Sequence, residues 1–238
     1  NDYYREISCD RFHFEGRVFD WVRLSRNRAD YVQGTANRRT RNEFFKELLD
    51  KLIEREGPET LAGFNGLTII YAGERFATAN RGTLFWPHRS ATTYHGKSWP
   101  YVICPEGGRR MANISVFCHE FGHVLGLPDL YARPENPGSE GIGPWCAMSN
   151  QSGNGRPQHF SAWCKAQFGW LEPVVIDPAV RQKLVLSPVE GATNQCFKVL
   201  VRPDGARWRS RRSRCESCRF SRGLRWCWQR PLPRPRAG

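Results

Sequence analysis

Residues 119–129 read HEFGHVLGLPD, and the prediction of the fold starts from this stretch. His119 and His123 are four positions apart, so on an α-helix both side chains project from one face and can bind one metal ion. Gly126 can end that helix, because glycine adopts a positive φ without a steric penalty, and Pro128 stiffens the turn that follows. The turn can then bring Asp129 back as a third ligand. The stretch therefore predicts a helix, a tight turn and a metal site.

The residue types in this pattern indicate hydrolytic zinc chemistry. Two imidazoles and a carboxylate suit Zn²⁺, whose catalytic sites have three protein ligands and an open position for water. Glu120, next to the first histidine, can take a proton from that water and pass it to the leaving amine as general base and acid. A helix that carries HExxH by coincidence is the alternative, but requiring Gly126 and Asp129 as well makes that coincidence far rarer. We expect a zinc metalloendopeptidase with one catalytic Zn²⁺; no calcium site can be read from the sequence.

The rest of the chain predicts an α+β fold. Residues 3–22 contain alternating apolar positions, which favour short strands joined by Gly16, and residues 75–98 read as irregular. Residues 67–72 form a β-branched run typical of a central strand. Asn113 is placed to begin the helix that carries the histidines. The other expected elements are helices within residues 44–53 and 160–168, a strand at 101–104, a loop at 131–143 and short strands between 174 and 201.

Several motifs resemble the immune inhibitor A-type zinc metallopeptidases, which are metzincin-like. They are HEFGHVLGLPDLY at 119–131, WCAMS at 145–149, FSAWCK at 160–165, FGWLEP at 168–173, WPH at 86–88 and DYYREIS at 2–8. The resemblance implies a metzincin-like zincin domain: a twisted mixed sheet, an active-site helix, a Met-turn at Met148 and a third helix, followed by a β-rich segment. It also implies that His119, His123 and Asp129 are zinc ligands and that Glu120 is the general base.

The same resemblance implies a secreted enzyme that acts on proteins or peptides and is made with an upstream inhibitory pro-segment. The chain begins at Asn1 rather than Met, which favours a leader and pro-segment upstream. No long apolar stretch predicts a membrane span. His88 and Tyr131 are further candidates for shaping the site, and packing is the alternative role for each. Cys118 adjoins His119 but points about 100° away on a helix, so we expect it in the core.

The positive charge is concentrated at one end of the chain. Residues 202–238 contain twelve arginines and only Asp204 and Glu216 as acids, a net of +10 out of +13 for the whole chain. The remainder is nearly balanced, which argues against nucleic acid as a partner of the main body. We predict three segments: a catalytic domain at 1–173, a β-rich continuation at 174–201, and an anomalous Arg/Trp-rich tail at 202–238 that is disordered or a frameshifted translation.

Two other functions fit parts of the sequence. The chain can be an inactive zinc-binding fragment of such a protease, because the tail replaces the strands expected after Val201. It can also be a basic nucleic-acid-binding protein that uses the tail. The nine cysteines show no regular spacing, so the sequence assigns no disulfide, and scattered buried thiols are the simplest interpretation.

Overall fold

The computed structural model describes residues 1–32, 38–75, 83–132, 141–150, 155–190, 196–199 and 224–229, with backbone alone for 38–39 and 224–229. The chain divides into two compact units. The sheet unit comprises Phe14–Pro128, Ser152–Pro157 and Leu224–Gly238, and the ribbon unit comprises Asn1–His13, Asp129–Gln151 and Gln158–Gly223.

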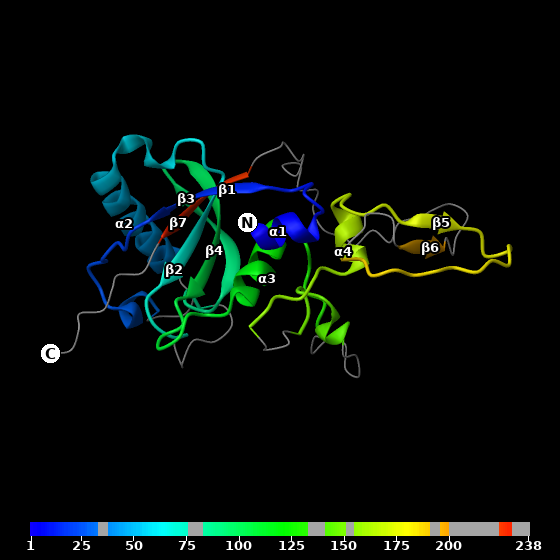
Figure 1. Cartoon of the computed structure of the whole chain (residues 1–238). Helices are drawn as coiled ribbons and strands as arrows, with labels where there is room; N and C mark the ends of the chain where they lie inside the picture. Colours follow the sequence, from blue (N-terminus) through cyan, green and yellow to red (C-terminus); the bar gives the residue numbers. More distant parts are fainter. Residues whose placement is uncertain are drawn as a thin grey trace. The chain divides into compact units, whose positions relative to one another are not determined.

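A five-stranded mixed sheet forms the centre of the sheet unit (Figure 1). Its order is β1-β7-β2-β4-β3, with parallel pairing from β1 to β4 and antiparallel pairing between β4 and β3. His95 and Gly96 connect β3 to β4 and both have positive φ, the backbone that a two-residue hairpin needs. The strands are β1 Phe14–Phe19, β2 Gly66–Tyr71, β3 His88–Tyr94, β4 Lys97–Pro105 and β7 Leu224–Gln229.

Two helices pack on opposite faces of this sheet, as Figure 1 shows. Helix α2, Arg38–Glu56, supplies apolar residues at helical spacing, and alternate residues of β2 and β4 meet them in one core. The rings of Phe45 and Tyr101 lie 4.4 Å apart in that core. Helix α3, Ile114–Val124, contacts β4 and β3. The short helices η1, Arg28–Tyr31, and η2, Pro58–Leu61, flank α2 along the chain.

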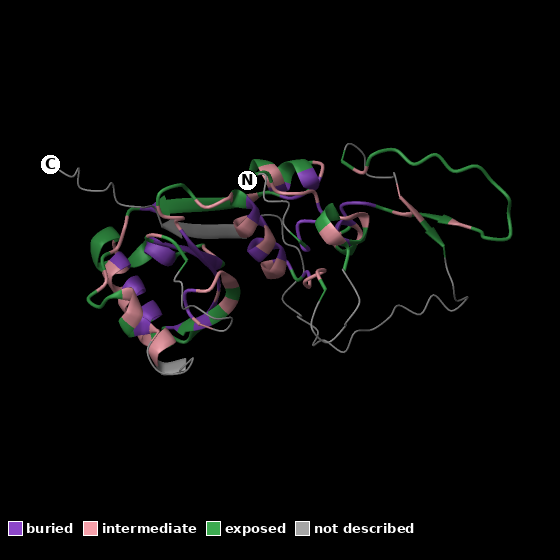
Figure 2. Ribbon diagram, turned by 90° about the horizontal axis from the view of Figure 1, so that it is seen from below, coloured by how far each residue is buried: buried purple, intermediate pink, exposed green. Residues whose placement is uncertain are grey.

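The ribbon unit has little regular structure. It contains α1 Asp2–Ile7, η3 Gly143–Trp145, α4 Ala162–Gln167 and a parallel pair of short strands, β5 Val174–Ile176 and β6 Phe197–Val199. Aromatic rings hold its centre: Phe160 stacks on Trp170 and meets Tyr4 edge to face. Residues 177–190 are almost all exposed (Figure 2). Within the described parts of the chain, no helix is long and apolar enough to cross a membrane.

The mixed α+β fold agrees with the prediction, and so do most of its elements. α2, β2, β4, α3 and α4 lie where the sequence placed them. Two expectations were wrong. Residues 2–7 form a helix rather than a strand, because Tyr4 and Ile7, three positions apart, both become buried on one helical face. Residues 88–94 form a regular strand rather than irregular chain, because pairing with β4 satisfies their backbone groups.

The tail gives one described element. Residues 224–229 form β7, which pairs with β1 on one side and β2 on the other. No strand was predicted there. The remainder of the segment 202–238 lies outside the described residues, and so does most of the expected loop 131–143, of which Tyr131 and Gly141 form an isolated bridge.

Candidate metal centre

Asn113 is the N-cap of helix α3, which begins there as the sequence predicts. The Asn113 side-chain Oδ1 accepts a hydrogen bond from the backbone N–H of Ser115 at 2.8 Å, which satisfies one of the donors left open at a helix start. Cys118 and Phe121, three positions apart, are buried, and the Phe121 ring lies 5.0 Å from that of Phe14. This packing fixes the rotation of the helix. Cys118 is therefore a core residue, as expected.

The helix ends at the glycine that the sequence marked. Gly126 has a φ of +105°, and a Cβ built there meets no atom within 4 Å, so the backbone conformation rather than space demands glycine. The N–H of Leu127 then donates to the carbonyl of Gly122 at 3.0 Å, and Gly126 donates to His123. These bonds close the last turn and redirect the chain toward Asp129.

The two histidine side chains converge at their Nε2 atoms, which lie 3.1 Å apart. Nδ1 of His123 lies 2.8 Å from the carbonyl oxygen of Leu127. Because a carbonyl can only accept, Nδ1 carries the proton, and Nε2 of the neutral ring presents a lone pair. A backbone carbonyl that orients a histidine in this way is the usual outer partner of a metal-binding imidazole.

Asp129 completes a group of three donor residues. Ligand atoms from His119, His123 and Asp129 all lie within 4.8 Å of one another, and all three residues are half-buried. It is the one such group among the described residues. Two nitrogens and one oxygen are a donor set that zinc accepts, and Zn–N bonds of about 2.0–2.1 Å in a tetrahedron place the two nitrogens about 3.3 Å apart, close to the observed spacing. The residues therefore fit one Zn²⁺.

Glu120 is separate from the three donors and is only 8% exposed. Glu120 interacts electrostatically with Cys104 on strand β4. Burial raises the pKa of the Cys104 thiol well above its usual range, and the negative charge of Glu120 raises this pKa further. Cys104 is therefore a neutral neighbour of Glu120 and not a second anion. This carboxylate lies on the helix that carries both histidines.

His88 and Met148, which the sequence also singled out for the site, make packing and backbone contacts. His88 contacts the backbone of Trp86 and the hydroxyl of Tyr101, and burial lowers its pKa, which describes a neutral packing residue. Met148 is fully buried in the ribbon unit, and its carbonyl accepts the N–H of Leu130 at 2.7 Å. The N–H of Ser149 donates to the carbonyl of Cys146, so a turn does form around Met148.

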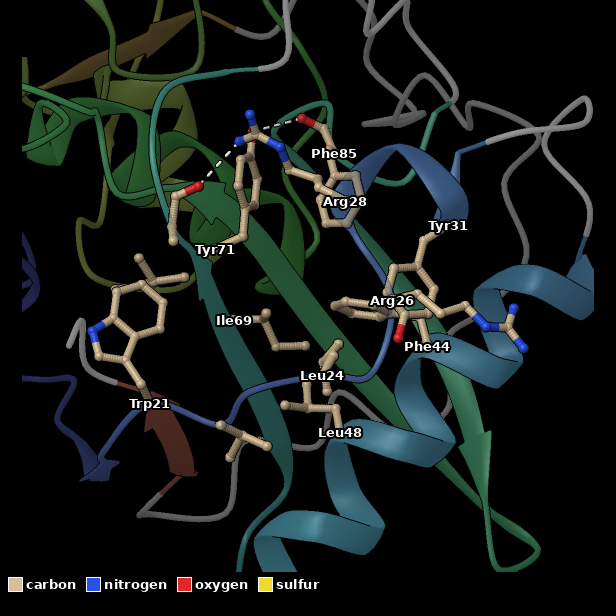
Figure 3. A pocket seen from close by; sticks show the side chains of 13 residues that line it. Trp21, Leu24, Arg26, Arg28, Tyr31, Phe44, Leu48, Ile69, Tyr71 and Phe85 are labelled. Carbon is tan, nitrogen blue, oxygen red and sulfur yellow. Dashed lines mark hydrogen bonds between the residues drawn. The ribbon is translucent and has the colours of Figure 1, made fainter.

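A cavity of about 210 Å³ lies on the α2 side of the sheet (Figure 3). Trp21, Tyr31, Phe44, Tyr71 and Phe85 are among the residues that line it. Its charged members are arginines, and Arg28 is held by the carbonyls of Ala72 and Glu74. None of its lining residues comes from 119–129, and none is a histidine or carboxylate. It therefore lacks the imidazole and carboxylate ligands of a zinc site.

Comparison with known proteins supports the resemblance read from the motifs. Residues 70–171 match the family model described as the catalytic domain of immune inhibitor A peptidase M6. Two curated relatives, both named pre-pro-metalloprotease PrtV, come from two strains of Vibrio cholerae serotype O1. Each is 29% identical over 212 residues, which cover 68% of this chain and 22% of the relative. The chain thus spans about a fifth of their length. No solved structure matches the chain. The predicted resemblance to this peptidase family is confirmed.

Proposed function

From the match of residues 70–171 to the catalytic domain of the immune inhibitor A peptidases, we propose that this chain is a zinc-dependent endopeptidase that hydrolyses peptide bonds of proteins. The observation that carries the proposal is the convergence of His119, His123 and Asp129, with ligand atoms within 4.8 Å of one another. The family match and the metalloprotease relatives support a metallopeptidase; the metal and the residue roles are our proposal.

The three donors would hold one Zn²⁺ through Nε2 of each histidine and a carboxylate oxygen of Asp129. Bound there, zinc would supply Lewis-acid polarisation of the scissile carbonyl and a lowered pKa for water. The chain's own contribution is orientation. The Leu127 carbonyl orients the His123 ring through a hydrogen bond, and the turn at Gly126 directs the backbone toward Asp129.

Glu120 is the proposed proton carrier. Its carboxylate accepts a proton from the attacking water and returns it to the leaving amine nitrogen, so it acts first as general base and then as general acid. Burial at 8% exposure separates Glu120 from bulk water, which limits proton exchange with solvent during the reaction. The neutral Cys104 thiol adds no competing charge.

Other features of the proposal follow from the resemblance. Residues 1–173 would form the catalytic domain, of metzincin-like type with Met148 in the Met-turn, and residues 174–201 its β-rich continuation. The words "pre-pro" in the relatives' name support a secreted enzyme made with an inhibitory pro-segment. Proteins or peptides are the proposed substrates, and neither nucleic acid nor membrane is a proposed partner.

The test combines metal content with peptide cleavage. The full chain should contain about one zinc per molecule and cleave casein or a quenched fluorescent peptide, and a chelator should stop the cleavage. Glu120→Gln should retain zinc and lose cleavage by about 10²–10⁴-fold, because it keeps the shape but removes the base. Glu54→Gln, an exposed glutamate on α2, is the matched control and should cleave like the parent. Cleavage unchanged in Glu120→Gln would refute the role of Glu120; zinc without any cleavage would identify an inactive zinc-binding fragment.

A further inference from the structure

Two buried cysteines of the ribbon unit lie side by side. The Sγ atoms of Cys146 and Cys164 are 3.7 Å apart, and both residues have no exposed surface. They are 18 positions apart in the chain. Cys146 lies in the segment before Met148, and Cys164 lies in the first turn of α4.

The surroundings of this pair favour reaction between the two sulfurs. Sγ of Cys146 accepts the backbone N–H of Met148 at 3.4 Å and that of Ser161 at 3.3 Å. The two sulfurs also share a hydrogen bond in which either can donate, and this bond, with the two backbone donors, lowers the pKa of Cys146 despite its burial. Cys146 is thus the better nucleophile, and Cys164 the thiol that resolves the intermediate.

From this geometry we propose that Cys146 and Cys164 form a disulfide that ties the segment containing Met148 to helix α4. The two sulfurs need to approach by about 1.7 Å to reach the bonding distance of about 2.05 Å. This proposal concerns a covalent bond within one unit and does not depend on the proposed protease activity.

The oxidant is a low-molecular-weight disulfide such as oxidised glutathione, and the exchange takes place late in folding, once these hydrogen bonds have formed and before the pair is closed off from solvent. The Cys146 thiolate attacks one sulfur of that disulfide and releases one thiolate, forming a mixed disulfide. The Cys164 thiolate then attacks Sγ of Cys146 and releases the second. The two cysteine protons end on the two released thiols, so two cysteines are oxidised and one small disulfide is reduced. Burial afterwards protects the bond from reductants.

The direct test is mass spectrometry of the full chain refolded in a glutathione redox buffer. The protein is unfolded without reductant, alkylated with iodoacetamide and cut after glutamate. Glu140 and Glu190 bound a peptide that contains Cys146 and Cys164 and no other cysteine, because the Glu172–Pro173 bond is not cut. We expect this peptide without alkyl groups and two hydrogens lighter than the dithiol. Cys118, on the separate peptide that ends at Glu120, is the internal control and should be alkylated. Alkylation of both Cys146 and Cys164, or pairing of either with another cysteine, would overturn the proposal.

A thermal measurement supports the first test and addresses the strength of the bond. Reductant applied during unfolding should lower the Tm by about 5–10 °C, because the open loop gains conformational freedom in the unfolded chain. The Cys146→Ser/Cys164→Ser double variant should lose this response, whereas Cys104→Ser, which removes a buried thiol of the sheet unit, should retain it. An equal response of the parent and the double variant would contradict the disulfide.

Discussion

At the scale of single residues, the proposed metal centre depends on how each donor is held. A proton on Nδ1 of His123 follows from its contact with the Leu127 carbonyl, so the second nitrogen is left to bind metal. Gly126 is required for its backbone, which no other residue adopts at low cost at a φ of +105°. The chemistry thus depends on local hydrogen bonds as much as on the three ligands.

Asp129→Ala should weaken zinc binding by about 100-fold or more, because it leaves two protein ligands where a catalytic zinc site uses three. Titration of the purified protein against a chromogenic zinc chelator measures this affinity. Asp20→Ala, which removes an exposed carboxylate of the sheet unit, should bind zinc like the parent. Equal affinities for Asp129→Ala and the parent would exclude Asp129 as a ligand.

At the scale of elements, the start of α3 is held by one side chain. Asn113→Ala should lower the free energy of unfolding by about 1 kcal/mol, because it removes the acceptor for the N–H of Ser115. Urea denaturation followed by circular dichroism measures the change. Asn113→Asp supplies the same acceptor and should stay within a few tenths of a kcal/mol of the parent. A loss of the same size in both variants would show that the cap is not the cause.

Hydrogen bonds to the Glu47 carboxylate join α2 to the segment that precedes it in the chain. Glu47 accepts hydrogen bonds from the Tyr31 hydroxyl at 2.6 Å and from Ser25, and it pairs with Lys51. Burial alone would raise the pKa of Glu47, but these partners outweigh burial and lower the pKa to about 2. A lowered pKa in the folded state means that the stabilisation is present above pH 4.5 and is lost as the pH falls toward 2.

Acid titration of stability tests this link. Protonation of Glu47 between pH 4.5 and 2 should lower the free energy of unfolding by about 1–2 kcal/mol. This value is reduced for solvent screening of the partly exposed carboxylate. Glu47→Gln should lose that part of the pH dependence, which denaturant unfolding at each pH measures. Glu54→Gln on the same helix serves as the control. If Glu47→Gln and the parent had the same pH profile, Glu47 would have no lowered pKa in the folded protein.

At the scale of the whole molecule, metal binding and stability should be coupled. A ligand that binds only the folded state stabilises it, by about 2.7 kcal/mol when its free concentration is one hundred times its Kd. A chelator should therefore lower the Tm, and added zinc should restore it; differential scanning calorimetry measures both. His119→Ala/His123→Ala should show no such response. If this variant responded like the parent, zinc would be acting at the free thiols instead.

The elements whose causes are local could be predicted from the order of residues alone. The i, i+4 histidines, the cap at Asn113, the stop at Gly126 and the β-branched run of β2 each depend on neighbours within one or two turns, so they could be predicted. The donor set His119, His123 and Asp129 was predicted for the same reason, since all three lie in one short stretch.

Features that join distant residues could not be predicted and became known from the fold. The N-terminal helix is stabilised by burial of Tyr4 among aromatic rings, and β7 by pairing with β1 and β2, which lie far from it along the chain. The contact between Cys146 and Cys164, 18 residues apart, has no signal in spacing, because which thiols meet depends on how the chain between them folds back. Local periodicity specifies which face a residue occupies, and long-range packing specifies what it meets there.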